Sequence, residues 1–411
     1  MKILIVSQYF WPENMRINDL VRDLIERGHK VTVLTGLPNY PEGSVYEDYK
    51  SNPASYSNFH GAEIVRVPMV ARGSNNLSLI LNYISFLVSA SVIGLWRVRS
   101  SKFDVVFSYA VSPILSSIPA VLLGKRKGIP VYIWVLDLWP ETLKAVGVVK
   151  SKKVLDLVGV VVRWVYDRCD YILMQSRAFE KSVLRYSSDS ADPGRLIYFP
   201  SWAEDDFLGE ISTESAILKP DSKVFTIVFA GNLGEAQDFP AVLDAVEATK
   251  HLPVRWVFVG DGRMTDWIKS EVATRQLENV LLPGRHPVSA MPPLFKAADA
   301  LLVSLKTNEI FGMTIPGKVQ TYLASGKPIL AMIDGEASKV VRESGAGLSC
   351  PSGDSQGLAD IVQELVEMSP TDREKMGSYG TTYYKEHFAK KSVMDKLEDL
   401  FRKERMVSRV G

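Results

Sequence analysis

A short stretch near residue 315 combines the groups that bind phosphate. Residues 311–328 read FGMTIPGKVQTYLASGKP, and Pro316 suits the first position of a helix that ends at the following Ser-Gly pair. The N-terminus of such a helix offers free backbone N–H groups, and here it also carries a hydroxyl and an ammonium. The residues at this expected diphosphate cradle are Thr314, Ile315, Gly317 and Lys318. An ordinary capped helix with an exposed lysine is the alternative.

Two glycine turns form a second candidate feature. Residues 229–238 read FAGNLGEAQD, in which Gly231 allows the backbone to approach a ligand closely. Asn232 and Gln237 could donate hydrogen bonds to phosphate or sugar oxygens. A second strand-end turn, with Gly260, follows within FVGDGR. Either turn alone fits any connection from a strand to a helix.

The first half of the chain contributes two charged candidates. Arg16 comes just before a helix N-terminus, where an anion is stabilised, although a plain surface arginine fits equally. Asp137 lies in VLDLWPE, at the carboxyl end of a strand that we expect to be central in its sheet. This aspartate could cap the next helix or present a carboxylate in a cleft.

Strand and helix patterns alternate along the chain and must position these residues. Short apolar runs such as KVTVLT (30–35), VYIWVL (131–136) and FTIVFA (225–230) are typical of buried parallel strands, and each precedes a segment of helical spacing. The alternation occurs in two series separated by a polar stretch at 200–223. We therefore expect an α/β protein with two Rossmann-like, doubly wound domains, 1–205 and 206–385, facing a central cleft.

Composition limits the classes of function. The 411 residues contain 48 Lys+Arg and 47 Asp+Glu, so a net charge of +1 gives no basic field for nucleic acid. Cys169 and Cys350 are the only cysteines, and the five histidines lack metal-ligand spacing, so we expect no disulfide framework and no metal site. The first ten residues are too short for a signal peptide, and we expect a cytoplasmic protein.

One uncharged segment departs from the globular pattern. Residues 77–96 read LSLILNYISFLVSASVIGLW and are followed by Arg97 and Arg99. Ser78, Asn82, Ser85 and Ser89 recur at helical spacing and form one narrow polar stripe. The sequence leaves three structures open for this segment: a core helix, a helix lying in the membrane interface, or a membrane span. Basic residues also flank an apolar helix at 154–164. They fit either a solvated charged face or a contact with an anionic leaflet.

The order of loops resembles the retaining glycosyltransferases of family 4, which have the GT-B fold. The WbuB/WcaI-like branch of O-antigen and capsule enzymes is the most similar. The motifs that carry this resemblance are RGHKVTVLTGLPNYPEG (27–43), DLWPE (137–141), FAGNLGEAQD (229–238), FVGDGR (258–263), IPGKVQTYLASGKPIL (315–330) and GAGLSCPSGD (345–354).

The resemblance implies transfer of a sugar, with retention, from a UDP- or GDP-sugar to a polyprenyl-diphosphate-linked acceptor at the cytoplasmic face of the inner membrane. It implies no cofactor, no metal, and a C-terminal helix (386–411) that returns to the first domain. The catalytic residues it implies are Asp137, Glu309 and Lys318. The donor-binding residues it implies are Arg16, Gly231, Asn232, Gln237, Gly260, Arg285, Thr314, Ile315, Gly317 and Thr321.

The chain departs from the family at one pair of positions. Relatives have two glutamates eight residues apart before ASGKP, whereas Met313 and Thr321 stand in that register here, and Glu309 lies four residues earlier than the first. The ribose contact of the second glutamate would pass to Thr321 or to water. A nucleotide-sugar epimerase of the same shape and an inactive, membrane-bound assembly scaffold are the alternatives to a transferase.

Overall fold

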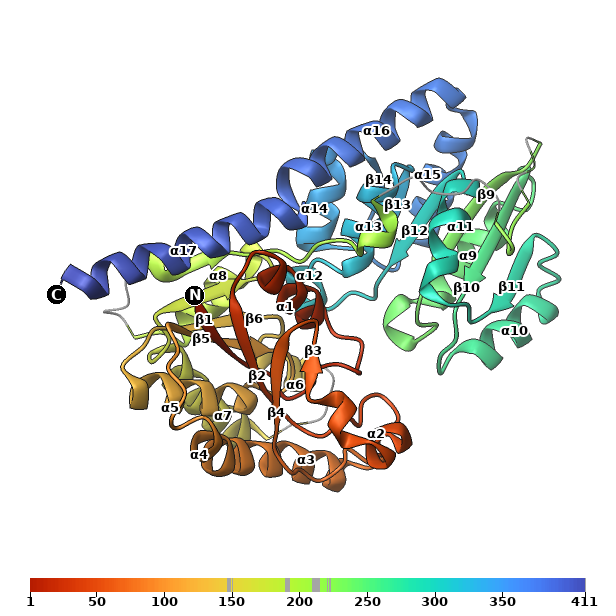
Figure 1. Cartoon of the computed structure of the whole chain (residues 1–411). Helices are drawn as coiled ribbons and strands as arrows, with labels where there is room; N and C mark the ends of the chain where they lie inside the picture. Colours follow the sequence, from red (N-terminus) through yellow and green to blue (C-terminus); the bar gives the residue numbers. More distant parts are fainter. Residues whose placement is uncertain are drawn as a thin grey trace. The chain divides into compact units, whose positions relative to one another are not determined.

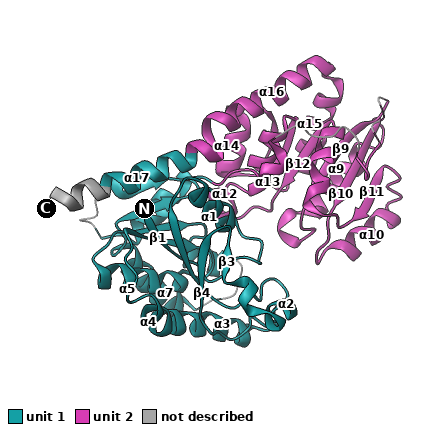
Figure 2. Cartoon of the chain, in the orientation of Figure 1, with its two compact units in different colours: residues 1–200, 393–411 teal, residues 201–392 magenta. Residues whose placement is uncertain are grey.

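The chain divides into two compact units, each built on its own sheet (Figures 1 and 2). The computed structural model describes residues 1–145, 149, 151–188, 193–208, 215–219, 221 and 223–410, with side chains up to residue 403. Unit 1 comprises residues 1–200 and 393–411, and unit 2 comprises residues 201–392. Unit 2 thus begins a few residues before the expected boundary at 205/206. The reason is that Ala203 N–H donates to the Tyr384 hydroxyl and that Asp205 pairs with Lys390.

Unit 1 contains a sheet of eight strands in the order β3-β4-β2-β1-β5-β6-β7-β8. Every pair is parallel except β3 with β4. The strands are β1 (Lys2–Val6), β2 (Lys30–Thr35), β3 (Asn58–Phe59), β4 (Ala62–Arg66), β5 (Val105–Ala110), β6 (Val131–Val135), β7 (Tyr171–Met174) and β8 (Leu196–Tyr198). Since β5 and β6 are buried at every position, helices must cover both faces of the sheet.

The helices of unit 1 connect these strands. They are α1 (Arg16–Glu26), α2 (Glu47–Ser51), α3 (Asn76–Ser89), α4 (Leu95–Arg97), α5 (Ile118–Lys127), α6 (Glu141–Ala145), α7 (Lys152–Tyr166) and α8 (Glu180–Arg185). Five single turns accompany them: η1 (Pro53–Tyr56), η2 (Ala90–Gly94), η3 (Ile114–Ser117), η4 (Arg177–Phe179) and η5 (Pro193–Arg195).

The last helix, α17 (Lys390–Val410), completes the core of unit 1. Val393, Met394, Leu397 and Phe401 are buried. The Phe401 ring meets the Tyr132 ring edge-on at 4.8 Å, and the Glu398 carboxylate pairs with Arg27 at 3.0 Å. The C-terminal segment is therefore part of the same unit as the N-terminus.

Unit 2 contains a parallel sheet of six strands in the order β11-β10-β9-β12-β13-β14. The strands are β9 (Phe225–Ala230), β10 (Val254–Val259), β11 (Val280–Gly284), β12 (Ala300–Ser304), β13 (Ile329–Met332) and β14 (Gly347–Cys350). The order of connection reverses between β9 and β12, so the loops after these strands diverge and open a crevice at their carboxyl ends.

The helices of unit 2 lie on both faces of that sheet. They are α9 (Phe239–Ala248), α10 (Thr265–Thr274), α11 (Met291–Ala297), α12 (Glu309–Met313), α13 (Gly317–Ser325), α14 (Gly335–Ser344), α15 (Ser355–Glu367) and α16 (Pro370–His387). Short turns are η6 (Asp205–Phe207), η7 (Glu235–Gln237) and η8 (Val288–Ala290). Pro316 is the residue before α13 rather than its first residue, so the helix begins at Gly317.

The uncharged segment of unit 1 forms α3, η2 and α4, and its polar stripe faces the protein. Asn82 is fully buried, and its side chain accepts hydrogen bonds from Gln8 at 2.7 Å and Tyr9 at 3.0 Å. Leu77, Ile80, Leu81, Ile84, Val88, Val92 and Trp96 are exposed instead. Among the described helices, Asn76–Arg97 alone has the length and mean hydropathy, 1.8, of a membrane-crossing helix.

Candidate functional site

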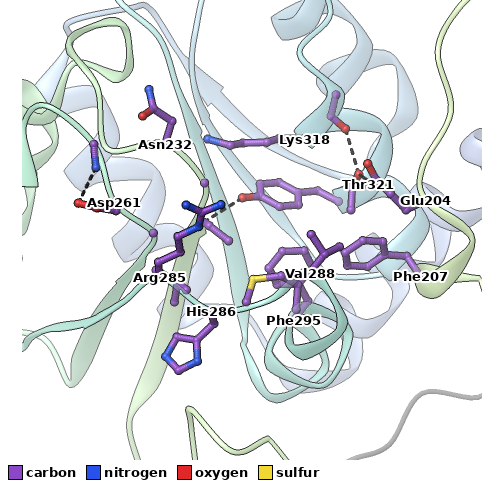
Figure 3. Close-up of a pocket in the computed structure, with 18 residues that line it drawn as sticks. Glu204, Phe207, Asn232, Asp261, Arg285, His286, Val288, Phe295, Lys318 and Thr321 are labelled. Carbon is purple, nitrogen blue, oxygen red and sulfur yellow. Dashed lines mark hydrogen bonds between the residues drawn. The ribbon is translucent and has the colours of Figure 1, made fainter. Parts of the chain in front are cut away.

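Unit 2 contains a cavity of about 760 Å³ at the carboxyl ends of its central strands (Figure 3). Loops that follow β9, β10 and β11 line one side, and the start of α13 lines another. The lining residues are Glu204, Phe207, Ala230, Gly231, Asn232, Val259, Gly260, Asp261, Gly262, Arg285, His286, Val288, Met291, Phe295, Gly317, Lys318, Thr321 and Tyr322. The cavity thus lies at the crevice that the strand order opens.

The two glycine turns pack directly against each other. Gly231 N–H donates to Val259 O at 2.9 Å, and a Cβ atom on Gly260 would lie 1.8 Å from Gly231 O. Gly260 has φ +139° and Gly231 φ +140°, which side chains rarely allow. Both positions therefore require glycine, and the turns leave the backbone exposed to whatever fills the cavity.

Among the residues that the structure describes, Lys318 is the one lysine that lines the cavity. Its ammonium lies 3.8 Å from the centre of the Phe229 ring and extends toward Asn232 (Figure 3). Within the described part of the chain it forms no ion pair, and desolvation lowers its pKa to about 7. Because α13 begins at Gly317, the first N–H groups of the helix add partial positive charge beside it. This end of the cavity is suited to an anion.

The opposite end of the cavity combines a carboxylate with apolar side chains. Thr321 Oγ1 lies 3.2 Å from Glu204 Oε2 and donates either to it or to Gly317 O at 3.1 Å (Figure 3). The Phe207 and Phe295 rings stack with centroids 5.4 Å apart. A ligand with a hydroxyl-bearing part and a flat apolar part fits this end.

The structure places most of the expected catalytic and donor-binding residues of unit 2 in the cavity lining. Those it brings together are Gly231, Asn232, Gly260, Arg285, Gly317, Lys318 and Thr321. Four others are not among the lining residues. Gln237 accepts a bond from Gly234 N–H, Thr314 donates to Ile310 O, Ile315 is buried, and Glu309 is exposed at the start of α12.

Sequence reasoning missed several lining residues. Glu204 and Phe207 lie in the stretch expected to link the domains, and no local pattern distinguishes them. Asp261 belongs to the FVGDGR motif, where the charge after the glycine could have signalled it, and Thr265 and Gly262 N–H lower its pKa by hydrogen bonding. His286 follows the expected Arg285 directly.

The two candidates of unit 1 differ in their surroundings. Burial raises the pKa of Asp137, whose carboxylate makes no hydrogen bond to the described residues and so does not cap α6. Arg16 is less available than expected, because it pairs with Asp19 at 2.9 Å. Asp137 therefore remains a candidate for contact with substrate, whereas Arg16 would have to leave its partner.

Comparisons with known proteins agree with this architecture. Residues 14–202 match the family described as glycosyl transferase 4-like domain, and residues 210–383 match glycosyl transferases group 1. A Pseudomonas aeruginosa protein named as a probable glycosyltransferase, WbjE, is 28% identical over 66% of this chain and 68% of its own. WcaI of Escherichia coli K12, named for a glycosyl transferase of colanic acid biosynthesis, is 27% identical over 79% of this chain and 82% of its own.

Solved structures share the fold at low identity. Anabaena HepE in complex with UDP and glucose has a TM-score of 0.66 at 15% identity, covering 98% of this chain and 99% of that one. Sucrose-phosphate synthase from Thermosynechococcus elongatus has a TM-score of 0.74 at 15% identity, covering 99% of both chains. With both family matches and both parallel-sheet units in place, the chain belongs to the glycosyltransferases of the GT-B type, with a 4-like domain followed by a group 1 domain.

Proposed function

We propose that this glycosyltransferase moves a sugar, with retention at its anomeric carbon, from a UDP- or GDP-sugar to a lipid-linked saccharide in bacterial surface polysaccharide biosynthesis. The observation that carries the proposal is the ammonium of Lys318, without an anionic partner in the described residues, beside the start of α13 in a cavity of about 760 Å³. The structure neighbour HepE binds UDP and glucose, which supports a nucleotide-sugar donor.

The cavity offers complementary groups for each part of such a donor. Lys318 and the N–H groups at the start of α13 would hold the diphosphate. Glu204 and Thr321 would accept and orient ribose hydroxyls in place of the glutamate that relatives carry at position 321. Phe207 and Phe295 would form the wall for the base.

The chemistry follows from where negative charge develops. When the sugar carbon separates from the diphosphate, charge accumulates on the β-phosphate, and fixed donors aimed at it lower the barrier by about 3 kcal/mol each. The acceptor oxygen then bonds to the anomeric carbon on the face that the diphosphate leaves. As this bond forms, the leaving phosphate oxygen takes the proton of the acceptor hydroxyl. Asp137 would orient the acceptor hydroxyl, and no enzyme nucleophile or metal is required by this route.

Nucleotide binding tests the donor site. Lys318→Ala should weaken UDP or GDP binding by about 1.5–3 kcal/mol, because a charge-assisted contact is lost. Lys306, exposed in the loop after β12, is the matched control, and Lys306→Ala should leave binding unchanged. Equal affinities of the Lys318→Ala variant and the unmodified protein in calorimetry would refute the assignment.

The acceptor side of the proposal rests on α3, which buries its polar stripe and exposes its apolar face. A helix that buries Asn82 and exposes Ile80, Ile84 and Val88 suits a lipid interface rather than water or a protein core. The strands before and after the segment, β4 and β5, belong to one sheet, and this supports a segment that would rest on one side of a membrane rather than cross it. We propose peripheral attachment to the cytoplasmic leaflet.

A second helix extends this surface. α7 exposes Leu157 and Val160, and both α7 and α3 pack against η3, so the two helices lie near each other in unit 1 (Figure 1). Aromatic rings with stacked arginines lie at the ends of both segments, Arg99 on Trp96 and Arg168 on Trp164. Such pairs suit the headgroup region of an anionic leaflet.

An inactive scaffold is the second candidate, favoured by one observation. The glutamate pair of relatives is absent, and Glu309 is exposed and not among the lining residues of the cavity. The test is to incubate the protein with a panel of UDP- and GDP-sugars and to measure the release of free sugar. Slow release that is lost in the Lys318→Ala variant would exclude the scaffold. Nucleotide binding without any turnover, with or without an acceptor, would favour it.

A further inference from the structure

Arg72 is held among tyrosines where the segment after β4 meets α3. Its guanidinium carbon lies 5.2 Å from the centre of the Tyr40 ring, and Nη1 donates to the Tyr9 hydroxyl at 3.4 Å. The Tyr83 phenol of α3 lies beside the same guanidinium. The three rings come from three separate segments, the loops after β1 and β2 and α3 itself, so the cluster forms only in the folded unit.

The polar stripe of α3 fixes the backbone that carries Arg72. Val70 N–H donates to Ser85 Oγ at 2.9 Å, and Asn82 Nδ2 donates to Val70 O. Arg72 N–H donates to Asn39 Oδ1 at 2.9 Å. The buried amides therefore hold the arginine in place, which lowers the entropic cost of binding a ligand there.

The positive charge of this arginine is not neutralised by the described residues. Arg72 forms no ion pair there, in contrast to Arg27, which pairs with Asp23, Asp395 and Glu398. Its neighbours are phenols, and burial raises the pKa of both Tyr9 and Tyr83, so these hydroxyls keep their protons. Tyr9 donates its proton to Asn82 Oδ1, which leaves the Tyr83 hydroxyl as the phenol donor beside the guanidinium. A forked cation with such a donor beside it matches the several acceptor oxygens of a phosphate group.

We infer that Arg72, with the hydroxyl of Tyr83, binds the diphosphate of the lipid-linked acceptor. This inference rests on the proposed function, since it needs an acceptor that arrives from a lipid surface. α3 connects the two ends of such a molecule. Ile80 and Ile84 are exposed for the lipid, while Tyr83 is near enough to both Arg72 and Asp137 for their charges to act on its pKa. The sugar next to the diphosphate would then lie close to the Asp137 carboxylate.

Vesicle sedimentation of the full chain tests the inference. Three vesicle types are compared: phosphatidylcholine alone, the same with undecaprenyl diphosphate, and the same with phosphatidylglycerol at equal charge. The unmodified protein should bind the diphosphate vesicles more tightly than the other two. Arg72→Gln should weaken that extra binding about tenfold or more, because a charge-assisted contact is lost, and should leave binding to the other vesicles unchanged.

Arg99 provides a matched control. It is exposed just after the apolar segment that begins with α3. Like Arg72 it stacks on an aromatic ring, with its guanidinium carbon 4.3 Å from the centre of the Trp96 ring. Arg99→Gln should reduce binding to all anionic vesicles equally and keep the preference for diphosphate. If Arg72→Gln fails to fold, Arg72→Lys, which keeps the charge without the fork, should fold and lose most of the preference.

The outcomes separate this inference from the proposed function. Failure of the unmodified protein to bind any vesicle would overturn the membrane acceptor and this site together. Vesicle binding without a preference for diphosphate, or a preference that survives in Arg72→Gln and Arg72→Lys, would overturn the site alone. A last experiment measures binding of inorganic pyrophosphate to the Lys318→Ala variant, with and without Arg72→Gln. If this binding depends on Arg72 while vesicles show no preference for diphosphate, the cluster binds a soluble diphosphate and the lipid inference is overturned.

Discussion

The exposed apolar face of α3 leads to a prediction about membrane binding. We would replace Ile80, Ile84 and Val88 together by Gln, since these residues lie one helical turn apart and Gln is a good helix former. The three side chains are 53%, 46% and 55% exposed. Burying such a side chain completely is worth about 1.5–3 kcal/mol, so removing the exposed half of each from water is worth about 2.3–4.6 kcal/mol in total.

The assay is sedimentation with vesicles that contain phosphatidylglycerol, at low and high salt. At about 1.4 kcal/mol for each factor of ten, the triple variant should bind roughly 40- to 2000-fold more weakly. The remaining binding should disappear in high salt, because basic side chains such as Arg97 and Arg99 are then screened. Binding of UDP or GDP should not change, since the cavity proposed for the nucleotide lies in unit 2.

Two controls distinguish a lipid-facing helix from a core helix. Leu281 and Tyr379 of unit 2 have comparable exposure, 42% and 46%, and their replacement by Gln should leave vesicle binding unchanged. Phe86 on α3 is fully buried, so Phe86→Gln should unfold unit 1. If the triple variant unfolds as Phe86→Gln does, or binds vesicles as tightly as the unmodified protein, the reasoning is wrong.

Three further predictions concern the cavity and the core. The pKa of Lys318 is about 7 in the folded state against about 10.4 in the unfolded chain, so the unfolded state binds more protons between these values and stability rises with pH there. Lys318→Met should therefore raise the melting temperature most below pH 7 and hardly at all above pH 10; a constant gain would contradict the shift. Gly260→Ala should lower the urea midpoint much more than Gly284→Ala, because a Cβ on Gly260 meets backbone at 1.8 Å while Gly284 faces open space, and equal effects would refute the packing of the two turns. Phe401→Ala should cost about 3–5 kcal/mol of unfolding free energy, while the exposed Arg402→Ala should cost under about 0.5; similar urea midpoints would show that α17 is not core.

The sheets could be predicted because buried parallel strands are local signals. VYIWV and FTIVFA are continuous apolar runs, and the structure has β6 and β9 at these positions. AEIVR of β4 alternates, and GLSC of β14 is short and begins with glycine, so neither forms a continuous apolar run. The number of consecutive apolar residues in a strand increases with its burial. Strands toward the edge of a sheet are less buried and are therefore harder to predict from sequence.

The site was predictable only where a turn carries its own signature. Gly231, Gly260 and Lys318 follow strands or begin a helix, and all three line the cavity. Glu204 reaches the same cavity from a stretch without periodicity, through a contact with Thr321 that spans more than a hundred residues of sequence. The stripe on α3 was visible as a period, but its direction depends on Gln8 and Tyr9, which lie far away in the sequence.

The position of α17 in unit 1 has a consequence for synthesis. The first 200 residues leave the ribosome without Met394, Leu397 and Phe401, whose side chains are fully buried in the finished unit. At about 5–20 residues per second, translation of residues 201–392 keeps that core incomplete for about 10–40 s. Unit 2 lies within one uninterrupted span of the chain and needs no such delay. Unit 2 can therefore complete its core before unit 1 does, and until α17 emerges unit 1 exposes the apolar surface that α17 buries in the finished unit.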